Sequence, residues 1–165
     1  MEASGQPMRI GDLLVRMGVL TPDQRDQVLE AQRSGSRPFG VLAEEMFGVS
    51  PGAVERAWAS QFAQLAPRID AATVQAEKAA LESVSRRQAW QFRVLPVRFA
   101  GSELIVATTQ ECLPRAMRFM AWRASHEVSF VLSDEQSLGI GLCRLFPMAG
   151  MSPDDVPLLR SGCST

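Results

Sequence analysis

The stretch RIGDLLVRMGVLTPDQRDQVLEAQ, residues 9–32, returns at a shift of 29 residues as PFGVLAEEMFGVSPGAVERAWASQ, residues 38–61. Both copies keep a glycine, a hydroxyl residue before proline and a terminal glutamine in step. The matched pairs include Gly11 and Gly40, Leu13 and Leu42, Leu20 and Val49, Thr21 and Ser50, Pro22 and Pro51, and Gln32 and Gln61. This agreement indicates an internal duplication, too short for a solenoid and long enough for two helical hairpins.

Thr21 and Ser50 each begin a predicted helix. Both are hydroxyl N-cap residues followed by proline at the first helical position, and Gln24 completes a capping box with Thr21. A short stretch with helical apolar spacing precedes each cap. Each copy is therefore predicted to be a short helix, a turn and a longer helix, with the longer helices over 22–34 and 51–63.

The residues after the duplication predict a mixture of helices and strands. The expected elements are a helical stretch over 70–91 broken near 83–85, a hairpin of strands 93–99 and 103–109, a helix over 114–124, a third strand over 127–132, and a helix to about 146 that a capping box at Ser133–Gln136 begins. Pro96 predicts that the first strand lies at an edge or carries a bulge. We expect Phe119, Met120 and Trp122 to pack against the sheet.

The predicted fold class is α+β, an N-terminal helical hairpin repeat packed beside a small three-stranded α/β subdomain. The expected domains are the duplicated helical hairpins over 8–66, the small α+β subdomain over 67–146 and a flexible tail over 147–165, where Pro, Ser, Gly and Asp dominate.

Composition excludes several classes of protein. The chain has 165 residues, of which 46% are apolar and 21% charged, so it can form a globular core. Seventeen basic against eighteen acidic residues give a net charge of -1, which argues against binding of a nucleic acid polymer. No stretch approaches the run of about 18 apolar residues that a membrane span needs, and the N-terminus lacks an apolar targeting segment. We expect a cytoplasmic protein that does not insert into a membrane.

The residues of common catalytic and metal sites are missing. There is no GxxxxGK[ST] loop, His126 is the only histidine, and the three cysteines Cys112, Cys143 and Cys163 form no CxxC pair. Free thiols in a reducing compartment are the expected state of the cysteines. We therefore predict no metal site, no catalytic residues and no enzymatic activity.

Taken in order, these motifs resemble a known family. Arg9-Ile10-Gly11, Leu14, Gly18-x-Leu20 and the terminal Gln32 are similar to the RLGxxL…GxL…LxxxLxxQ unit of 24 residues that occurs twice in the N-terminal domain of type II secretion and type IV pilus assembly ATPases. Val94–Val97 and Leu104–Thr109 resemble the later VLP and VAT phrases of that domain. The resemblance covers about residues 8–146 and does not include an ATPase domain.

One branch of the family binds cyclic di-GMP across the two units, and the resemblance implies a set of ligand-binding residues here. Such a ligand needs guanidinium and backbone donors for its phosphates, glycines for close approach and apolar side chains for its guanines. The candidates are Arg9, Ile10, Gly11, Leu14, Arg25, Leu29, Gln32, Arg37, Phe39, Gly40, Val54, Trp58 and Gln61. The alternative is that the two glycines only allow close helix packing and the two glutamines only decorate helix ends.

The second unit departs from the family pattern. Pro38 stands where a cation is expected, with Arg37 one position early, and proline removes both the charge and a backbone donor. Further departures are Arg25 at an apolar position, Ala43 and Trp58 at leucine positions and Phe47 at a glycine position. Two functions follow: a non-enzymatic regulatory module that docks on secretion or pilus proteins or on a related ATPase, and, as the alternative, a cyclic di-GMP receptor domain. No other cofactor is expected.

Overall fold

The computed structural model describes residues 8–156. The chain divides into two compact units, Met1–Leu65 and Ala66–Thr165, here called the helical unit and the sheet unit. Cys163 and the last part of the expected tail lie outside the described residues. No described helix is long and apolar enough to cross a membrane.

The helical unit contains two equivalent helix pairs. Its elements are α1 (Ile10–Arg16), α2 (Pro22–Arg33), α3 (Phe39–Phe47) and α4 (Pro51–Leu65). α1 and α3 begin 29 residues apart, and so do α2 and α4, which is the shift of the sequence repeat. The duplication predicted from the sequence is therefore also present in the structure.

Equivalent positions of the repeat form the core of the helical unit. The buried pairs are Leu13 and Leu42, Leu14 and Ala43, Leu20 and Val49, and Val28 and Ala57. Thr21 forms the predicted capping box with Gln24, and the Ser50 hydroxyl accepts a hydrogen bond from the Ala53 N–H at 3.2 Å. The same cap chemistry begins both long helices.

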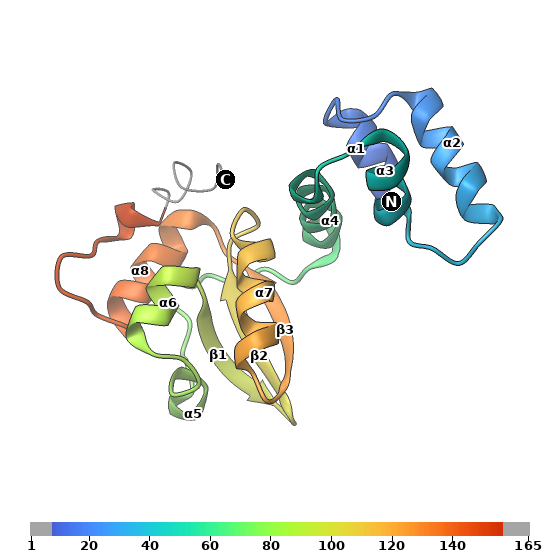
Figure 1. Cartoon of the computed structure of the whole chain (residues 1–165). Helices are drawn as coiled ribbons and strands as arrows, with labels where there is room; N and C mark the ends of the chain where they lie inside the picture. The colour runs from blue at the N-terminus through green and yellow to red at the C-terminus, as the bar shows by residue number, and fades with distance from the viewer. Residues whose placement is uncertain (1–7, 157–165) are drawn as a thin grey trace, which may run out of the picture. The chain divides into compact units, whose positions relative to one another are not determined.

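The sheet unit is built on a three-stranded sheet in the order β1-β2-β3. Its elements are α5 (Lys78–Leu81), α6 (Arg86–Phe92), β1 (Leu95–Ala100), β2 (Glu103–Thr108), α7 (Leu113–Arg123), β3 (Glu127–Leu132), α8 (Glu135–Leu145) and the 3-10 turn η1 (Pro153–Asp155). β1 and β2 form an antiparallel hairpin, and β2 and β3 are parallel, joined by α7 (Figure 1). β1 lies at an edge and its register shifts between Pro96 and Arg98, which confirms both properties expected of this strand.

Aromatic side chains hold α6 against its neighbours. The Trp90 side chain is 2% exposed, and its Nε1–H donates to the Phe146 carbonyl at 2.8 Å. Phe92 stacks on Phe119 of α7 with ring centroids 4.0 Å apart. Because both contacts remove large apolar rings from water, they fix α6 and α7 on the sheet unit's core.

Two predicted helix boundaries are wrong. Residues 70–77 are not helical, since the Asp70 carboxylate accepts from the Ala72 N–H and the Glu77 N–H donates to the Val97 carbonyl of β1. At α8 the N-cap is Asp134, whose carboxylate accepts from the Ser137 N–H at 2.8 Å. Ser133, expected as the cap, is buried and accepts from the Ala71 N–H instead.

The described part of the expected flexible tail is packed. Val156 is buried, and the Pro153 backbone lies so close to Gly139 that a Cβ at that glycine would approach the Pro153 carbonyl oxygen to 2.4 Å. The Arg93 guanidinium donates to the Asp155 carbonyl at 2.7 Å. The segment thus continues the fold beyond α8.

Candidate functional site

Gly11 and Gly40 make equivalent helix contacts in the two copies. A Cβ at Gly11 would lie 2.8 Å from Phe39 Cζ and 3.2 Å from Arg25 Cγ. A Cβ at Gly40 would lie 2.6 Å from Cγ1 of Val54, the residue that matches Arg25 in the repeat. Both glycines therefore allow close helix packing, the alternative that the sequence left open.

Two of the candidate phosphate-binding arginines already have carboxylate partners. Arg25 forms ion pairs with Asp12 at 2.9 Å and with Asp26 at 3.1 Å, and these contacts, first the hydrogen bond to Asp26, raise its pKa. Arg37 holds both carboxylate oxygens of Glu45, one at 2.6 Å, and the hydrogen bond lowers the pKa of Glu45. A phosphate would have to compete with these carboxylates for both guanidinium groups.

Arg9 differs from these two cations. It is exposed at the N-cap position of α1, where its carbonyl accepts from the Leu13 N–H at 3.0 Å. Within residues 8–156, its guanidinium group has no hydrogen bond or ion pair. Of the three candidate arginines, it is the one whose charge no described carboxylate neutralises.

The remaining candidates take mixed positions in the helical unit. Leu14 and Phe39 are buried in its core, and the Gln32 amide donates to the Arg37 carbonyl at 3.4 Å. Trp58 is half-buried and stacks on Phe62 with ring centroids 5.4 Å apart. Ile10, Leu29, Val54 and Gln61 are half-buried. The structure thus joins Gly11 with Arg25 and Phe39, Gly40 with Val54, and Gln32 with Arg37.

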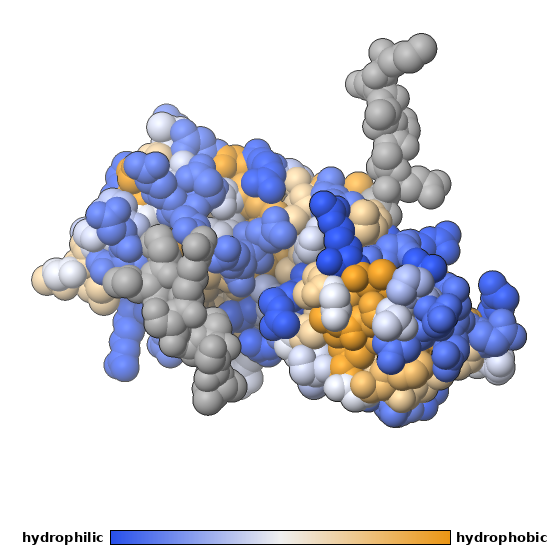
Figure 2. All heavy atoms as spheres, turned by 90° about the horizontal axis from the view of Figure 1, so that it is seen from above, coloured by the Kyte–Doolittle hydropathy of each residue, from blue (hydrophilic) through white to orange (hydrophobic). Residues whose placement is uncertain are grey.

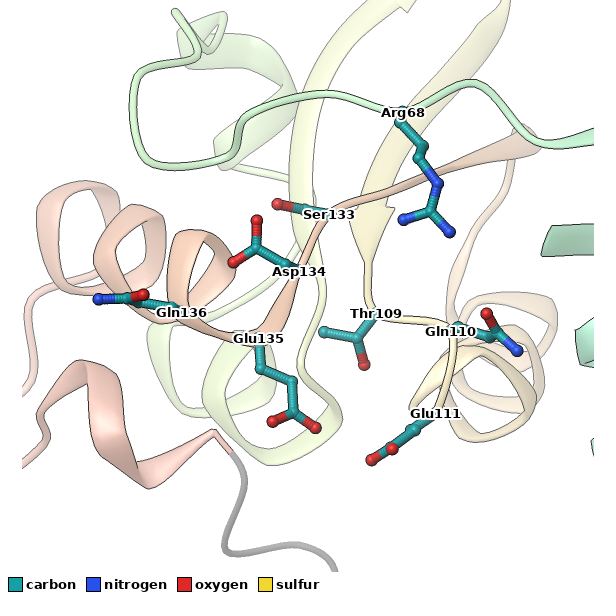
Figure 3. A pocket seen from close by; sticks show the side chains of 8 residues that line it. All are labelled: Arg68, Thr109, Gln110, Glu111, Ser133, Asp134, Glu135 and Gln136. Atoms are coloured by element: carbon teal, nitrogen blue, oxygen red, sulfur yellow. The ribbon is translucent and has the colours of Figure 1, made fainter. Parts of the chain in front are cut away.

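A hollow of about 540 Å³ lies at the carboxyl ends of β2 and β3. It is lined by Arg68, Thr109, Gln110, Glu111, Ser133, Asp134, Glu135 and Gln136, whose side chains surround the opening in Figure 3. The position between parallel strand ends is a common place for ligands in α/β proteins. The chemistry of the lining decides what this hollow can do.

The Thr109 hydroxyl and the Asp134 carboxylate of this hollow stabilise local backbone. The Thr109 hydroxyl accepts from the Cys112 N–H at 3.1 Å, and Asp134 caps α8. The backbone hydrogen bond from Ser137 lowers the pKa of Asp134 and keeps it ionised. None of the lining residues is a histidine or cysteine.

The exposed side of α7 carries a large aromatic residue. Trp122 is 82% exposed, so the expectation that it packs against the sheet is wrong. The buried residues of α7 include Ala116 and Met120, four positions apart, and Trp122 lies two positions beyond Met120, on the opposite side of the helix. The apolar residues Leu113, Ala116 and Met120 are spaced by three and four positions, and Trp122 does not fall on this series. This spacing is the sequence signal that would have predicted Trp122 to be exposed.

Cations share the solvent-facing surface of α7 with Trp122. Arg115 and Arg118 precede it by seven and four residues, which places all three along one side of the helix. Arg115 lies over the Phe92 ring at 5.4 Å from its centroid, and Arg118 is exposed. Trp122, Arg115 and Arg118 are called the α7 face below.

A second hollow, of about 240 Å³, lies between α7 and β3. Met117, Met120, Ala121 and Ala124 line it from α7 and the residue after it, and His126, Val128 and Phe130 from β3 and the residue before it. Small side chains at Ala121 and Ala124 leave this space open. Outside the sheet unit, exposed apolar side chains include Met17, Val41 and Met46, and Figure 2 shows apolar surface on the helical unit.

Residues 65–151 match the MshEN domain family. Among solved structures, one described as MshE with cdg is 24% identical, with a TM-score of 0.47, over 84% of this chain and 99% of that chain. The N-terminal domain of XpsE is 17% identical, with a TM-score of 0.45, over 87% and 98% of the two chains. No curated protein sequence matches at a significant level.

The fold and its surfaces define a module of duplicated helical hairpins followed by a small α+β unit. The chain belongs to the MshEN domain family, because the family match spans more than half of its residues. This match confirms the resemblance to the N-terminal domain of type II secretion and type IV pilus assembly ATPases that the sequence indicated. The match begins at residue 65, so it includes the VLPV and LIVATT phrases but none of the candidate ligand-binding residues of the helical unit.

Proposed function

We propose that the chain is a cytoplasmic, non-enzymatic docking module that binds a protein of the secretion or pilus machinery or a related ATPase. The observation that carries this proposal is the 82% exposure of Trp122 on the α7 face. Tryptophan and arginine are the residues most enriched at the energetic centres of protein interfaces. When a partner covers a large apolar ring that is otherwise exposed to water, the burial of that ring stabilises the complex, and the neighbouring cations add contacts with aromatic rings.

Replacing Trp122 by alanine is expected to weaken partner binding about 30-fold, the size of an interface centre's contribution. The full chain is immobilised, and the secretion, pilus or ATPase proteins that bind to it are identified. The dissociation constant of the protein that binds most tightly is then measured by interferometry. Met46→Ala, which shortens an exposed apolar side chain of the helical unit, is the matched control and should leave binding unchanged.

Three results would contradict the docking function. The first is recovery of chaperones alone by a folded chain. The second is equal binding of the partner by the Trp122→Ala variant, because the α7 face would then play no part. The third is a fall in binding with Met46→Ala as large as with Trp122→Ala.

Binding of cyclic di-GMP by the helical unit is the second candidate function. It is favoured by the duplication of the helix pairs and by the exposed Arg9, whose guanidinium group has no partner within residues 8–156. A ligand with two phosphates and two guanines can use equivalent groups from both helix pairs. The ion pairs of Arg25 and Arg37 oppose it, because breaking each pair reduces the gain from phosphate binding.

This second function predicts a micromolar dissociation constant for cyclic di-GMP in calorimetry of the full chain. Arg9→Ala should weaken it roughly ten- to hundredfold, since a charge-assisted contact contributes about 1.5–3 kcal/mol. Arg16→Ala removes another exposed cation from α1 and serves as the control. Absence of heat at high micromolar ligand, with the protein folded, would exclude the receptor function.

A further inference from the structure

The two edges of the sheet are protected differently. Along β1, the Glu77 N–H donates to the Val97 carbonyl at 2.8 Å, and the Glu77 carboxylate accepts from the Phe99 N–H at 3.1 Å. One residue thus satisfies outward backbone groups of β1 and blocks the approach of another strand. Proteins commonly cover sheet edges in this way, because an open edge pairs readily with other chains.

Within residues 8–156, backbone pairing covers the outer edge of β3 only at its end. The Leu132 N–H donates to the Pro67 carbonyl at 2.9 Å, and the Leu132 carbonyl accepts from the Ile69 N–H at 3.0 Å, a parallel bridge centred on Arg68. Backbone groups of a strand alternate between its two sides, so Val128 and Phe130 present theirs to the same outer edge. Among the described residues, no group pairs with them there.

The open part of β3 borders the hollow against α7. Val128 and Phe130 line that hollow with their side chains, while Met117, Ala121 and Ala124 line it from the helix side. Figure 1 shows α7 lying over β3 at this edge of the sheet. An edge strand with unpaired backbone, beside an apolar space under a helix, is the arrangement in which an extended peptide adds as a new strand.

We propose that an extended segment of a partner protein binds here as a fourth strand beside β3, with apolar side chains in the α7–β3 hollow and acidic side chains at its rim. The proposal rests on the docking function above and gives the same partner a second contact, separate from the one at Trp122. Backbone pairing with Val128 and Phe130 supplies affinity, and the hollow selects the alternate side chains that face it.

The charge at the rim selects an acidic segment. Arg118 lies one helical turn before Ala121, and Arg123 directly precedes Ala124, so two exposed arginines stand next to residues that line the hollow. Glu103 and Glu127 are paired residues of β2 and β3, and Glu103 already accepts from the Ser129 hydroxyl. The cations would repel those of a second copy of the chain, which disfavours pairing of two β3 strands across a dimer.

The test uses linear decapeptides selected from a random phage-displayed library on the full chain, then labelled for fluorescence anisotropy. Selected sequences should alternate apolar residues with Asp or Glu and should bind more weakly as salt rises. Val128→Pro removes an outward N–H without removing a bond to β2, so the strand should still form. It should weaken peptide binding at least tenfold.

A second variant tests the proposal even if the Val128→Pro protein does not fold. Ala121→Glu places a carboxylate at the exposed margin of the hollow and should also weaken acidic peptides at least tenfold. Ala79→Glu makes the same change on exposed α5, beside β1, and should leave binding unchanged.

Several outcomes would overturn the inference. They are the selection of no peptide, the selection of basic peptides, or equal peptide binding by the wild type, Val128→Pro and Ala121→Glu. Concentration-dependent dimers that Val128→Pro abolishes would assign the edge to a second copy. Tighter peptide binding by a chain ending at Val156 would assign it to the chain's own last residues. If Trp122→Ala still weakens partner binding about 30-fold in any of these cases, the docking function stands and only the fourth strand is wrong.

Discussion

Replacing Gly141 by alanine is expected to unfold the sheet unit at temperatures where the wild-type protein is folded. A Cβ at this position of α8 would lie 2.3 Å from the Ala71 carbonyl oxygen and 3.0 Å from its carbon. The same Cβ would lie 3.1 Å from Leu95 Cδ2, so a second neighbour also crowds the added methyl group. Overpacking against backbone costs about 3 kcal/mol, which lowers the melting temperature by about 12 °C or more.

The measurement is thermal unfolding followed by circular dichroism, with Gly52→Ala as the matched control. Gly52 is also helical, in α4, but its Cβ would meet only Arg56 Nη1 at 3.5 Å, an ordinary contact. Alanine there should stabilise the helical unit by about 0.5 kcal/mol, because it has the higher helix propensity. A Gly141→Ala protein that melts with the wild type would contradict the close approach of α8 to residue 71.

Much of the fold could be predicted because its signals are local. The Thr21 cap and the hydroxyl-Pro pair at Ser50 lie within one helical turn of the helices they begin. The third strand was predicted at its observed bounds, Glu127–Leu132, and Pro96 marked the irregular edge strand. Such signals depend on residues a few positions apart, which a single sequence displays directly.

The wrong predictions come from contacts between distant residues. Glu77 leaves the expected helix because it pairs with β1, and Ser133 is not the cap because it bonds Ala71. Arg93 is buried with a φ of 53°, and its guanidinium donates to the carbonyls of Trp90 and of Asp155, 62 residues away. Burial lowers the pKa of Arg93. Nothing near position 93 in the sequence distinguishes it from an exposed arginine.

The candidate ligand-binding residues show that residue type alone does not reveal which partners a side chain has in the fold. Residue types identified Arg25 and Arg37 as cations for a phosphate, yet their carboxylate partners Asp12 and Glu45 lie thirteen and eight positions away. Conversely, Trp122 was assigned to the core by its spacing on the predicted helix, whereas the structure exposes it. Together these two differences move the balance from a ligand in the helical unit toward a partner on the sheet unit.

Gly40→Ala is expected to destabilise the helical unit by about 2 kcal/mol, because the added Cβ would lie 2.6 Å from Val54 Cγ1. Val54 branches at Cβ, so its helical rotamer is stiff and the methyl cannot turn aside. In the Val54→Ala background that methyl is absent, and alanine at position 40 gains about 0.5–1 kcal/mol in helix propensity. The double-mutant cycle, measured by urea unfolding, should therefore give a coupling of about 2.5–3 kcal/mol.

The first copy of the repeat supplies the control for this cycle. Gly11→Ala meets the tip of the Phe39 ring at 2.8 Å and the flexible Arg25 chain at 3.2 Å. Since Arg25 can yield where Val54 cannot, its pair with residue 11 should show a coupling below about 1 kcal/mol, even though the helices correspond. Additive effects at positions 40 and 54 would contradict the contact between α3 and α4. Equal couplings in both copies would show that Arg25 is held as firmly as Val54. In that case its ion pairs to Asp12 and Asp26 would keep its guanidinium group from binding a phosphate.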